Sequence, residues 1–261
     1  MNTKIYVVTH KSFIPPKDTL YEPIQVGKYF TKVDLGFLSD DTEDNIAEKN
    51  KNYCELTALY WMWKNDKTTE TIGLCHYRRY FTKKVFSRKE SFFLDINNIT
   101  SILKEYDVIV PKEVKRSDIT VREFYSYCEG KDKDILLLRE CMMSHYPEYV
   151  DSYDAILNGK KAFYCNMFIL SKKLFDEYCQ WLFTLLFDLE EKIDISDYTP
   201  QQARVYGYLS ELLLNVWIKH KKLKYKEIDI VNIEISFLQS IKDKIVSFLK
   251  RMLKKMRSKQ K

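Results

Sequence analysis

Glycine and proline are scarce in this chain of 261 residues, which contains only 6 of each. Flexible linkers and low-complexity regions are rich in these residues, so their scarcity argues against such segments. The six cysteines and four histidines are scattered, and no C-x-x-C pair occurs. A structural zinc site is therefore not expected, and we interpret the cysteines as reduced, mostly buried thiols of a cytosolic protein.

Several common sequence signatures are also missing. No run of about 18 apolar residues is present, which argues against a membrane-spanning helix, and the first residues lack the charged and apolar regions of a signal peptide. There is no G-x-G-x-x-G, no P-loop and no G-x-S-x-G. The chain is therefore not expected to be a dinucleotide-dependent oxidoreductase, a P-loop kinase or a hydrolase with a nucleophile elbow.

Apolar and aromatic residues, in contrast, are plentiful. Hydrophobic residues make up 45% of the chain and aromatic residues 15%. This is enough for one large domain, or for a main domain with an appendage. Aromatic richness is typical of proteins that bind sugars or nucleotides, because aromatic rings stack on both, but a tyrosine-rich core would give the same composition.

Charge is distributed unevenly along the chain. The net charge is +6, but residues 241–261 contain nine lysines and arginines against one aspartate, so this segment carries +8 and the rest carries −2. Its apolar residues recur at helical spacing from Ile241 through Phe248 to Met256, and basic residues fill the other face. We expect a basic amphipathic helix at 236–261 that binds the inner face of the cell membrane. Docking on the body of the protein and nucleic-acid binding are the alternatives, and the body offers no nucleic-acid module to support the second.

The body of the chain alternates between strand and helix patterns. Asn45 is the expected N-cap of the first helix, with Glu48 at its third position. The alternation predicts an α/β fold, with a mixed, mostly parallel sheet flanked by helices. Strands are expected at 4–10, 24–27, 71–75, 107–110, 163–170 and 228–231, and helices at 45–65, 94–106, 117–141, 174–189 and 199–217.

The most informative segment is Gly73-Leu-Cys-His-Tyr-Arg-Arg-Tyr-Phe81. An apolar strand ends there in a His-Tyr-Arg-Arg string at 76–79, and core strands rarely end in two guanidinium groups that cannot lose their charge. Arginines bind phosphate groups through forked, charge-assisted hydrogen bonds. The segment therefore predicts a phosphate or diphosphate site.

Other polar residues lie at strand ends or within apolar elements. In an open α/β sheet, ligands bind beyond the carboxyl ends of the strands, which places Thr9 and His10 near a ligand; an ordinary loop histidine is the alternative for His10. Asn166 lies in the middle of an apolar strand pattern, where a buried amide needs partners. The polar or semi-polar residues of the otherwise apolar helix 199–217 include Gln202, Arg204, Tyr208 and Glu211.

Four segments are distinctive when taken together. They are Glu55-Leu-Thr-Ala-Leu-Tyr-Trp-Met-Trp-Lys64, Ile72-Gly-Leu-Cys-His-Tyr-Arg-Arg-Tyr-Phe81, Tyr164-Cys-Asn-Met-Phe168 and Gln202-Ala-Arg-Val-Tyr-Gly-Tyr-Leu-Ser-Glu211. They resemble a bacterial family of capsule and exopolysaccharide glycosyltransferases that was long catalogued only as a domain of unknown function. The resemblance covers residues 4–230, and the His-Tyr-Arg-Arg-Tyr-Phe string is its most specific part.

This resemblance implies a GT-A-like glycosyltransferase domain over residues 1–235, with the basic segment 236–261 outside it. It implies transfer of a hexose from a UDP-sugar, with UDP-galactofuranose as a candidate donor. The acceptor would be a lipid-linked oligosaccharide used for capsule, exopolysaccharide or O-antigen synthesis. Because such acceptors lie in the inner leaflet, the basic segment independently favours a cytoplasmic protein bound to the membrane surface, without a nucleic-acid partner.

The expected site differs from most GT-A enzymes in one respect. Those enzymes hold a divalent metal on the diphosphate with an Asp-x-Asp after the central strand, whereas the comparable strand here ends in residues 76–79. Asp132-Lys-Asp134 has the letters of an Asp-x-Asp motif, but it is expected in a charged turn and not after the central strand. Arginine and histidine can neutralise the departing UDP in place of a metal. We therefore expect a site without a metal cofactor, and a divalent metal is the alternative.

The predicted roles of the basic and polar residues follow from this reasoning. Arg78 and Arg79, assisted by His76, hold the diphosphate, although one of the two arginines could instead pair structurally. The residues expected to contact the donor are Thr9, His10, Tyr77, Asn166, Gln202 and Arg204.

An acceptor hydroxyl needs a base if the reaction inverts the anomeric centre. Glu211 is the first candidate, because it is an acid inside a buried helix, and a structural pair with Arg204 is the alternative. Glu55 and Asp107 are weaker candidates. Two other functions stay open: a non-catalytic nucleotide- or carbohydrate-binding protein of the same fold, and a phosphate-handling enzyme unrelated to sugars.

Overall fold

A computed structural model describes residues 2–85, 87–128 and 130–235 of the chain. The predicted basic helix at 236–261 lies outside these residues. The strands are β1 (Thr3–Thr9), β2 (Tyr21–Gln25), β3 (Leu38–Ser39), β4 (Thr71–His76), β5 (Arg79–Thr82), β6 (Val108–Pro111), β7 (Val114–Lys115), β8 (Lys161–Ala162), β9 (Phe168–Ser171) and β10 (Tyr225–Asn232). The α-helices are α1 (Asn50–Tyr53), α2 (Leu56–Asn65), α3 (Ile96–Ile102), α4 (Val121–Tyr127), α5 (Asp132–His145), α6 (Val150–Leu157), α7 (Lys172–Lys192) and α8 (Val205–His220). Short 3₁₀ turns include η1 (Lys28–Phe30), η2 (Ala47–Lys49) and η5 (Gln202–Arg204).

The main sheet has the order β3-β2-β1-β4-β5-β10-β6-β9, and β9 also pairs with β4. β1 lies between β2 and β4 and is parallel to both, with Ile5 opposite Tyr21 on one side and Gly73 on the other. β6 and β10 are parallel to each other, whereas β9 is antiparallel to β4 and β6. The predicted α/β fold with a mixed sheet is confirmed. The sheet is mostly parallel, as predicted, because six of its eight strands run in one direction and β5 and β9 run in the opposite one.

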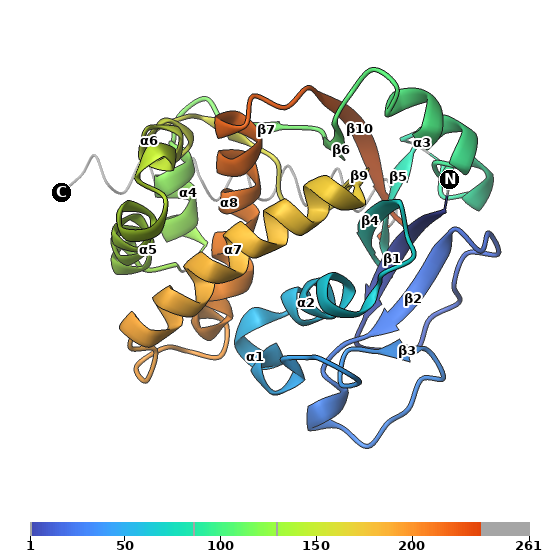
Figure 1. Ribbon diagram of the computed structural model, residues 1–261, viewed down its shortest axis with the longest axis horizontal. Coiled ribbons are helices and arrows are strands. Elements are labelled where there is room, and N and C mark those ends of the chain that lie inside the picture. Colours follow the sequence, from blue (N-terminus) through green and yellow to red (C-terminus); the bar gives the residue numbers. More distant parts are fainter. Residues whose placement is uncertain (1, 86, 129, 236–261) are drawn as a thin grey trace.

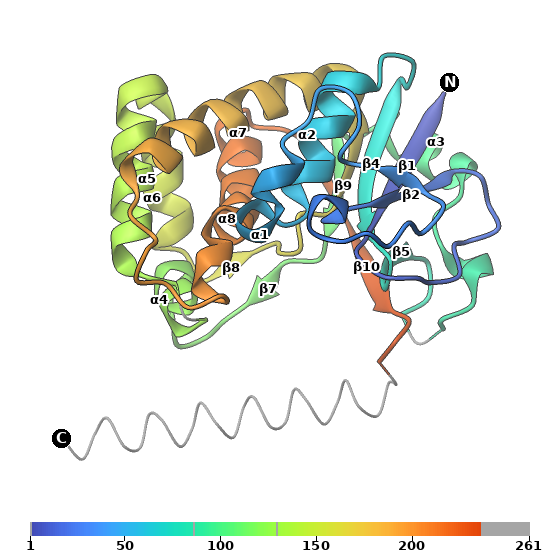
Figure 2. The same ribbon diagram turned by 90° about the horizontal axis from the view of Figure 1, so that it is seen from below.

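Alternate residues of β1 enter two different cores, as the period of a strand requires. Ile5 and Val7 are buried together with Ile99 of α3. Tyr6 and Val8 are buried in the larger cluster that contains the apolar residues of α2, α7 and α8. In Figures 1 and 2, α4, α5, α6 and α8 lie to one side of the sheet, and α3 lies at its opposite side. Apolar burial on both faces thus fixes the strands whose ends carry polar residues.

The predicted helix 45–65 is divided at Cys54. This residue has φ 54° and ψ −127°, a conformation that ends α1, and α2 begins afresh at Leu56. Its N-terminal end also differs from the prediction: the Asn45 side chain accepts a hydrogen bond from the Ala47 N–H at 3.1 Å and precedes the 3₁₀ turn η2. Apolar residues continue at helical spacing through the break, so the sequence pattern did not reveal it.

The predicted strand 163–170 is also divided. Cys165 and Asn166 form a turn with φ values of 79° and 50°, and the strand β9 begins only at Phe168. The helix predicted at 117–141 is likewise two helices, α4 and α5, joined by the residues around Gly130. In both cases a turn interrupts a segment whose apolar residues looked continuous.

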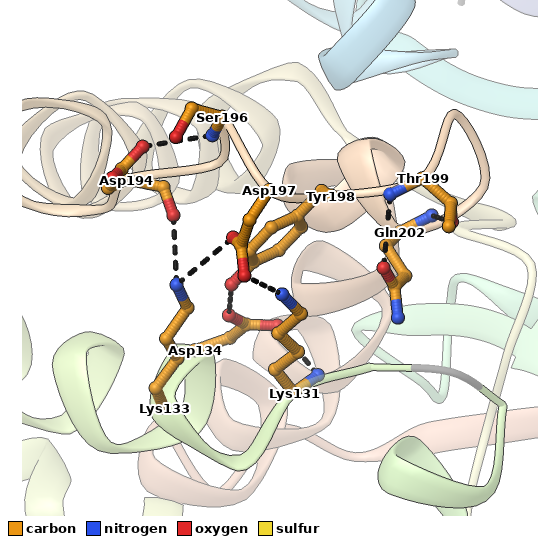
Figure 3. A network of polar contacts seen from close by, with 9 residues as sticks. All are labelled: Lys131, Lys133, Asp134, Asp194, Ser196, Asp197, Tyr198, Thr199 and Gln202. Atoms are coloured by element: carbon orange, nitrogen blue, oxygen red, sulfur yellow. Dashed lines mark hydrogen bonds and ion pairs between the residues drawn. The ribbon is translucent and has the colours of Figure 1, made fainter.

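Asp134 links the first turn of α5 to the segment that precedes α8. It accepts hydrogen bonds from the Lys131 N–H at 3.0 Å and the Tyr125 hydroxyl at 2.7 Å, and from the Tyr198 hydroxyl. Figure 3 shows the contacts of Asp134 with Lys131 and Tyr198, and the Lys131 side chain also pairs there with Asp197 at 2.6 Å. These contacts hold residues 194–202 in place, and that segment leads directly to one wall of the cavity described next.

Candidate active site

A cavity of about 590 Å³ lies where β1, β2 and β4 end. These strands are parallel, so their carboxyl ends meet at one edge of the sheet, where α/β proteins usually bind ligands. The opposite wall comes from the α1–α2 break and from η5 and α8. The lining residues are Val8, His10, Val26, Asn50, Lys51, Cys54, Glu55, His76, Tyr77, Arg78, Arg79, Cys165, Gln201, Arg204, Tyr208 and Glu211.

The His-Tyr-Arg-Arg string forms a tight turn between β4 and β5. His76 pairs with Arg79 across this turn, and Arg79 pairs on its other side with Asn232 of β10. The Tyr77 N–H donates to the Val8 carbonyl at 3.0 Å, which ties the turn to the end of β1. The sequence pattern had placed these residues at the end of a strand, and the structure adds that they turn directly into an antiparallel one.

Arg78 and Arg79 both line the cavity but differ in their partners. The Arg78 guanidinium lies 3.8 Å from the Glu234 carboxylate, which also pairs with Lys11 at 2.8 Å. Among the residues that the structure describes, the Arg79 guanidinium has no hydrogen-bond or ion-pair partner. An arginine without a partner at the wall of a cavity is available to an anionic ligand.

The imidazole of His76 is held at the rim between the two arginines and the turn at 165–166. Its Nε2 lies 2.6 Å from the Cys165 carbonyl oxygen, which can only accept a hydrogen bond, so Nε2 carries the proton. Burial lowers the pKa of His76, and the charges of Arg79 and Arg78 lower it further, against a raising effect of Glu55. The direction of this shift favours the neutral imidazole at pH 7.

Glu211 and Glu55 are the two carboxyl groups of the cavity. The pKa of Glu211 is raised to about 8, chiefly by burial and also by the charge of Glu55, although the Cys165 N–H, Arg79 and Arg204 act in the opposite direction. The ionised form of Glu211 can accept a proton from a ligand hydroxyl.

Asn166 does not line the cavity but fixes one of its acids. Its Nδ2 donates to Glu55 Oε1 at 2.8 Å and to Ser210 Oγ at 2.8 Å, and it lies 3.3 Å from the Gly207 carbonyl. The Asn166 side chain thus joins α2 to α8 behind the site. A residue with positive φ stands on each side, at Cys54 and in the Cys165–Asn166 turn, and strained backbone of this kind often accompanies a functional site.

The other predicted donor residues divide into two groups. His10 and Tyr77 lie at the cavity wall with their rings 5.5 Å apart at 88°, and the pKa of His10 is lowered by burial and by Lys11. Arg204 also lines the cavity, where its Nε lies 3.1 Å from Cys54 Sγ. No ion pair between Arg204 and Glu211, which was the alternative role for this acid, occurs among the described residues.

Three predicted residues lie outside the cavity lining. Thr9 is fully buried, and its hydroxyl donates to the Lys11 carbonyl in a turn after β1. The Gln202 side chain accepts a hydrogen bond from the Thr199 N–H at 3.1 Å, at the start of η5. Asp107, the weaker candidate for the base, accepts a hydrogen bond from the Lys224 N–H at 2.8 Å, at the opposite end of β10 from Arg79.

Sequence reasoning missed several residues of the cavity wall. Cys54 and Cys165 reach it only because their positive φ values break a helix and a strand, which no pattern announced. Lys51 adds a further positive charge, with its Nζ 4.3 Å from the centroid of the Phe30 ring. Tyr208 lies one helical turn before Glu211, and that spacing was the available signal.

Metal binding by these residues was tested from the donor groups present. Across the described residues, no group of three or more histidines, cysteines, aspartates or glutamates could hold a metal ion. Asp132 and Asp134 point to other partners, since Asp132 pairs with Arg122 and Asp134 with the tyrosines described above. Glu55 and Glu211 alone, with arginines beside them, are a poor donor set for a divalent cation.

A family model described as a domain of unknown function (DUF4422) matches residues 4–222. The chain belongs to this family. Among solved structures, it is similar to the apo structure of WbbM, a bifunctional glycosyltransferase, with a TM-score of 0.77 and 30% sequence identity. The match covers 89% of this chain and 45% of that chain. No curated protein matches this chain.

The mixed α/β fold is thus similar to that of a glycosyltransferase structure, as the sequence resemblance implied. A separate observation concerns membranes: within the described residues, no helix is both long and apolar enough to cross a bilayer.

Proposed function

We propose that this chain is a glycosyltransferase that moves a hexose from a UDP-sugar to the hydroxyl group of an acceptor. The observation that carries the proposal is the composition of the cavity at the strand ends. Arg78 and Arg79 supply positive charge at one wall, and Glu55 and Glu211 supply a proton acceptor at the other. Similarity to WbbM supports transfer of a sugar as the reaction.

In the proposed mechanism, the guanidinium groups of Arg78 and Arg79 bind the diphosphate of the donor. The acceptor oxygen attacks the anomeric carbon, the bond between that carbon and the diphosphate oxygen breaks, and UDP leaves with the bonding electrons. The arginines stabilise the negative charge that develops on the leaving oxygen. Tyr77 and His10 offer rings at the strand end for the uracil base.

The acceptor hydroxyl transfers its proton to the carboxyl pair of Glu211 and Glu55 in a reaction that inverts the anomeric centre. A base works best when its pKa lies near the working pH, and burial raises the pKa of Glu211 to about 8. We assign the proton to Glu211 and a supporting role to Glu55, whose Oε1 is held by Asn166 at 2.8 Å.

We further propose that the reaction does not require a divalent metal. The support is the poor donor set of the cavity and the presence of arginines where a metal would neutralise the diphosphate. In finer detail, we propose a GT-A-like enzyme with UDP-galactofuranose as the first donor to test. The proposed acceptor is a lipid-linked oligosaccharide for capsule, exopolysaccharide or O-antigen synthesis.

A cytoplasmic location at the inner face of the membrane is part of the same proposal. Its support is the basic sequence of 241–261, together with the place where the described chain ends. The Ile233 N–H donates to the Arg78 carbonyl at 2.9 Å, and Glu234 pairs with Lys11, so residues 233 and 234 lie beside the cavity. Binding of the basic segment to a membrane would keep the cavity close to a lipid-linked acceptor.

The decisive test is calorimetry of the full chain with UDP, once with Mn²⁺ and once with EDTA, followed by a screen of nucleotide sugars for hydrolysis or transfer. We expect UDP to bind equally well under both conditions and one UDP-sugar to be consumed. Absence of UDP binding would overturn the proposed function, and binding without turnover would indicate a non-catalytic binding protein. Loss of binding in EDTA alone would overturn the metal-independent mechanism.

A further inference from the structure

A second, smaller cavity adjoins the first one across α8. It measures about 150 Å³, and Tyr208 and Glu211 line both cavities, so these two side chains form the wall between them. A cavity of about this size can hold one six-membered ring. The remaining lining residues are Val121, Phe124, Tyr125, Cys128, Gly130, Tyr164 and Leu212.

The two cavities differ in chemistry. The larger cavity contains the arginines, whereas Glu211 is the only acidic or basic lining residue of the smaller one among the residues described. The smaller cavity is instead walled by aromatic rings, and those of Phe124 and Tyr164 meet edge to face at 5.6 Å. An aromatic wall with one acid matches a neutral, ring-shaped ligand with hydroxyl groups, because the C–H face of a sugar packs on aromatic rings.

Arg116 packs against two rings of the aromatic wall. The guanidinium carbon of Arg116 lies 3.3 Å from the centroid of the Phe124 ring and 5.3 Å from that of Tyr164. Stacking of an arginine on two rings fixes their orientation. Phe124 and Tyr164 are nevertheless only half-buried, so part of each ring surface is open to a ligand.

We propose that the smaller cavity is the subsite for the acceptor sugar, with Phe124 and Tyr164 as its stacking platform. This inference rests on the proposed function. A base must reach the acceptor hydroxyl and lie close to the anomeric carbon of the donor. Glu211 meets both conditions if the donor occupies the cavity with the arginines and the acceptor occupies the aromatic one, because it lines both cavities. The acceptor class is therefore a neutral hexosyl residue at the end of a longer glycan or glycolipid.

The test compares the full chain with its Phe124→Ala variant, using the UDP-sugar found in the donor screen and octyl glycosides of common hexoses as acceptors. Three quantities are measured: KM for the donor, KM for the acceptor, and hydrolysis of the donor without acceptor. We expect Phe124→Ala to raise the acceptor KM at least tenfold, with the donor KM and the hydrolysis rate within twofold of wild type. Phe124→Trp should restore the acceptor KM, because it restores a stacking surface.

Two controls keep the test decisive. Tyr106→Ala removes a ring beside β6, at the far end of the sheet, and should leave all three quantities unchanged. Phe124→Leu preserves most of the buried volume, so it replaces Phe124→Ala if that variant does not fold by circular dichroism. An unchanged acceptor KM in a folded variant would overturn the inference.

The remaining outcomes separate this inference from the proposed function. A rise in the donor KM alone would mean that the donor sugar occupies the aromatic cavity, and the acceptor assignment would be overturned. If the wild-type chain neither binds UDP nor hydrolyses any UDP-sugar, the proposed function itself fails and takes the inference with it. If UDP-sugar hydrolysis is intact and only the Phe124 effect is missing, the proposed function stands and the subsite does not.

Discussion

The fold raises the pKa of Glu211, and this shift affects both the stability of the protein and the proposed proton transfer. Its folded pKa of about 8 lies above the ordinary value of 4.5, chiefly because of burial. Between these two values the folded state binds more protons at this site than the unfolded state does, so Glu211 lowers stability as the pH rises from 5 to 8. The same shift makes the ionised form of Glu211 a stronger base, and the fraction of molecules in that form grows as the pH rises toward 8.

Replacing Glu211 by Gln should separate these two effects. We expect transfer to fall by about 10²–10⁴-fold, because the base is lost. The free energy of unfolding of the variant, relative to wild type, should rise by roughly 1–3 kcal/mol between pH 5 and pH 8.5, since wild type alone becomes charged there. Urea unfolding at the two pH values measures this. Glu191→Gln, at an exposed glutamate of α7, is the control, and equal pH dependence in both variants would contradict the raised pKa.

We predict that Arg79 contributes to ligand binding and not to the stability of the fold. Because its guanidinium has no partner among the described residues, Arg79→Ala should leave the melting temperature within about 2 °C of wild type. Affinity for UDP should fall about 10–100-fold, the size expected for a lost charge-assisted hydrogen bond. Calorimetry measures the affinity for UDP, and thermal unfolding measures the melting temperature. A large loss of stability with unchanged affinity would show a structural arginine.

Glu234 competes with a diphosphate for the cations at the cavity mouth. It pairs with Lys11 at 2.8 Å and lies 3.8 Å from Arg78, and Lys11 lowers the pKa of its carboxyl group. Solvent screens exposed pairs of this kind, so Glu234→Gln should raise UDP affinity only by about twofold to fivefold. Calorimetry at low salt gives the measurement, and Glu177→Gln, which removes another exposed pair on α7, is the control. A weaker affinity in Glu234→Gln would show that this carboxylate assists binding.

At the scale of elements, the site is assembled where three elements break or end. The turn at Cys165–Asn166, the α1–α2 break at Cys54 and the start of α8 meet behind the cavity. Gly207 allows this approach, because a Cβ at that position would lie 3.2 Å from Cys54 Sγ. The Asn166 amide then joins the three elements through Glu55, Ser210 and the Gly207 carbonyl.

Substitutions at Asn166 should separate two contributions to stability: the positive φ of the backbone and the hydrogen bonds of the side-chain amide. Asn166→Gly keeps the positive φ and loses only the amide contacts, whereas Asn166→Ala adds a backbone cost of about 1–2 kcal/mol. Asn166→Asp places a second carboxylate against Glu55 and should be the least stable, by roughly 2–4 kcal/mol relative to wild type. Urea unfolding at pH 8 gives the order. If Asp proved as stable as Asn, the contact with Glu55 would not matter.

The same elements show what the sequence could and could not predict. The strands β1 and β4 were predictable because their apolar runs are short and bounded by polar residues, and the arginines at the end of β4 marked the cavity. The breaks at Cys54 and Cys165 were not predictable, because each depends on a backbone conformation set by packing against other elements. Gln202 and Thr9 were predicted to bind the donor because they are polar and lie near the expected site. In the structure they make local turn contacts, which one sequence cannot distinguish from ligand contacts.

At the scale of the molecule, the last strand of the sheet leads directly to the cavity, and the described chain ends beside it. β10 runs from Tyr225 to Asn232 and pairs with β5 beside the arginine turn, after which Ile233 and Glu234 contact that turn. The basic segment follows within a few residues. Under the proposed function, binding of this segment to a membrane would bring the cavity close to a lipid-linked acceptor.

Deleting residues 241–261 tests this arrangement. The segment carries nine basic residues, and each contributes about 1 kcal/mol near an anionic leaflet, so the truncated chain should lose at least tenfold in affinity for phosphatidylglycerol vesicles and move to the soluble fraction. Replacing Phe248 and Met252 by Ser keeps the charge and removes part of the apolar face, which separates electrostatic from hydrophobic binding. Donor hydrolysis should stay unchanged in both variants, whereas transfer to a lipid-linked acceptor in vesicles should fall. An unchanged vesicle affinity after truncation would reject the segment as a membrane anchor.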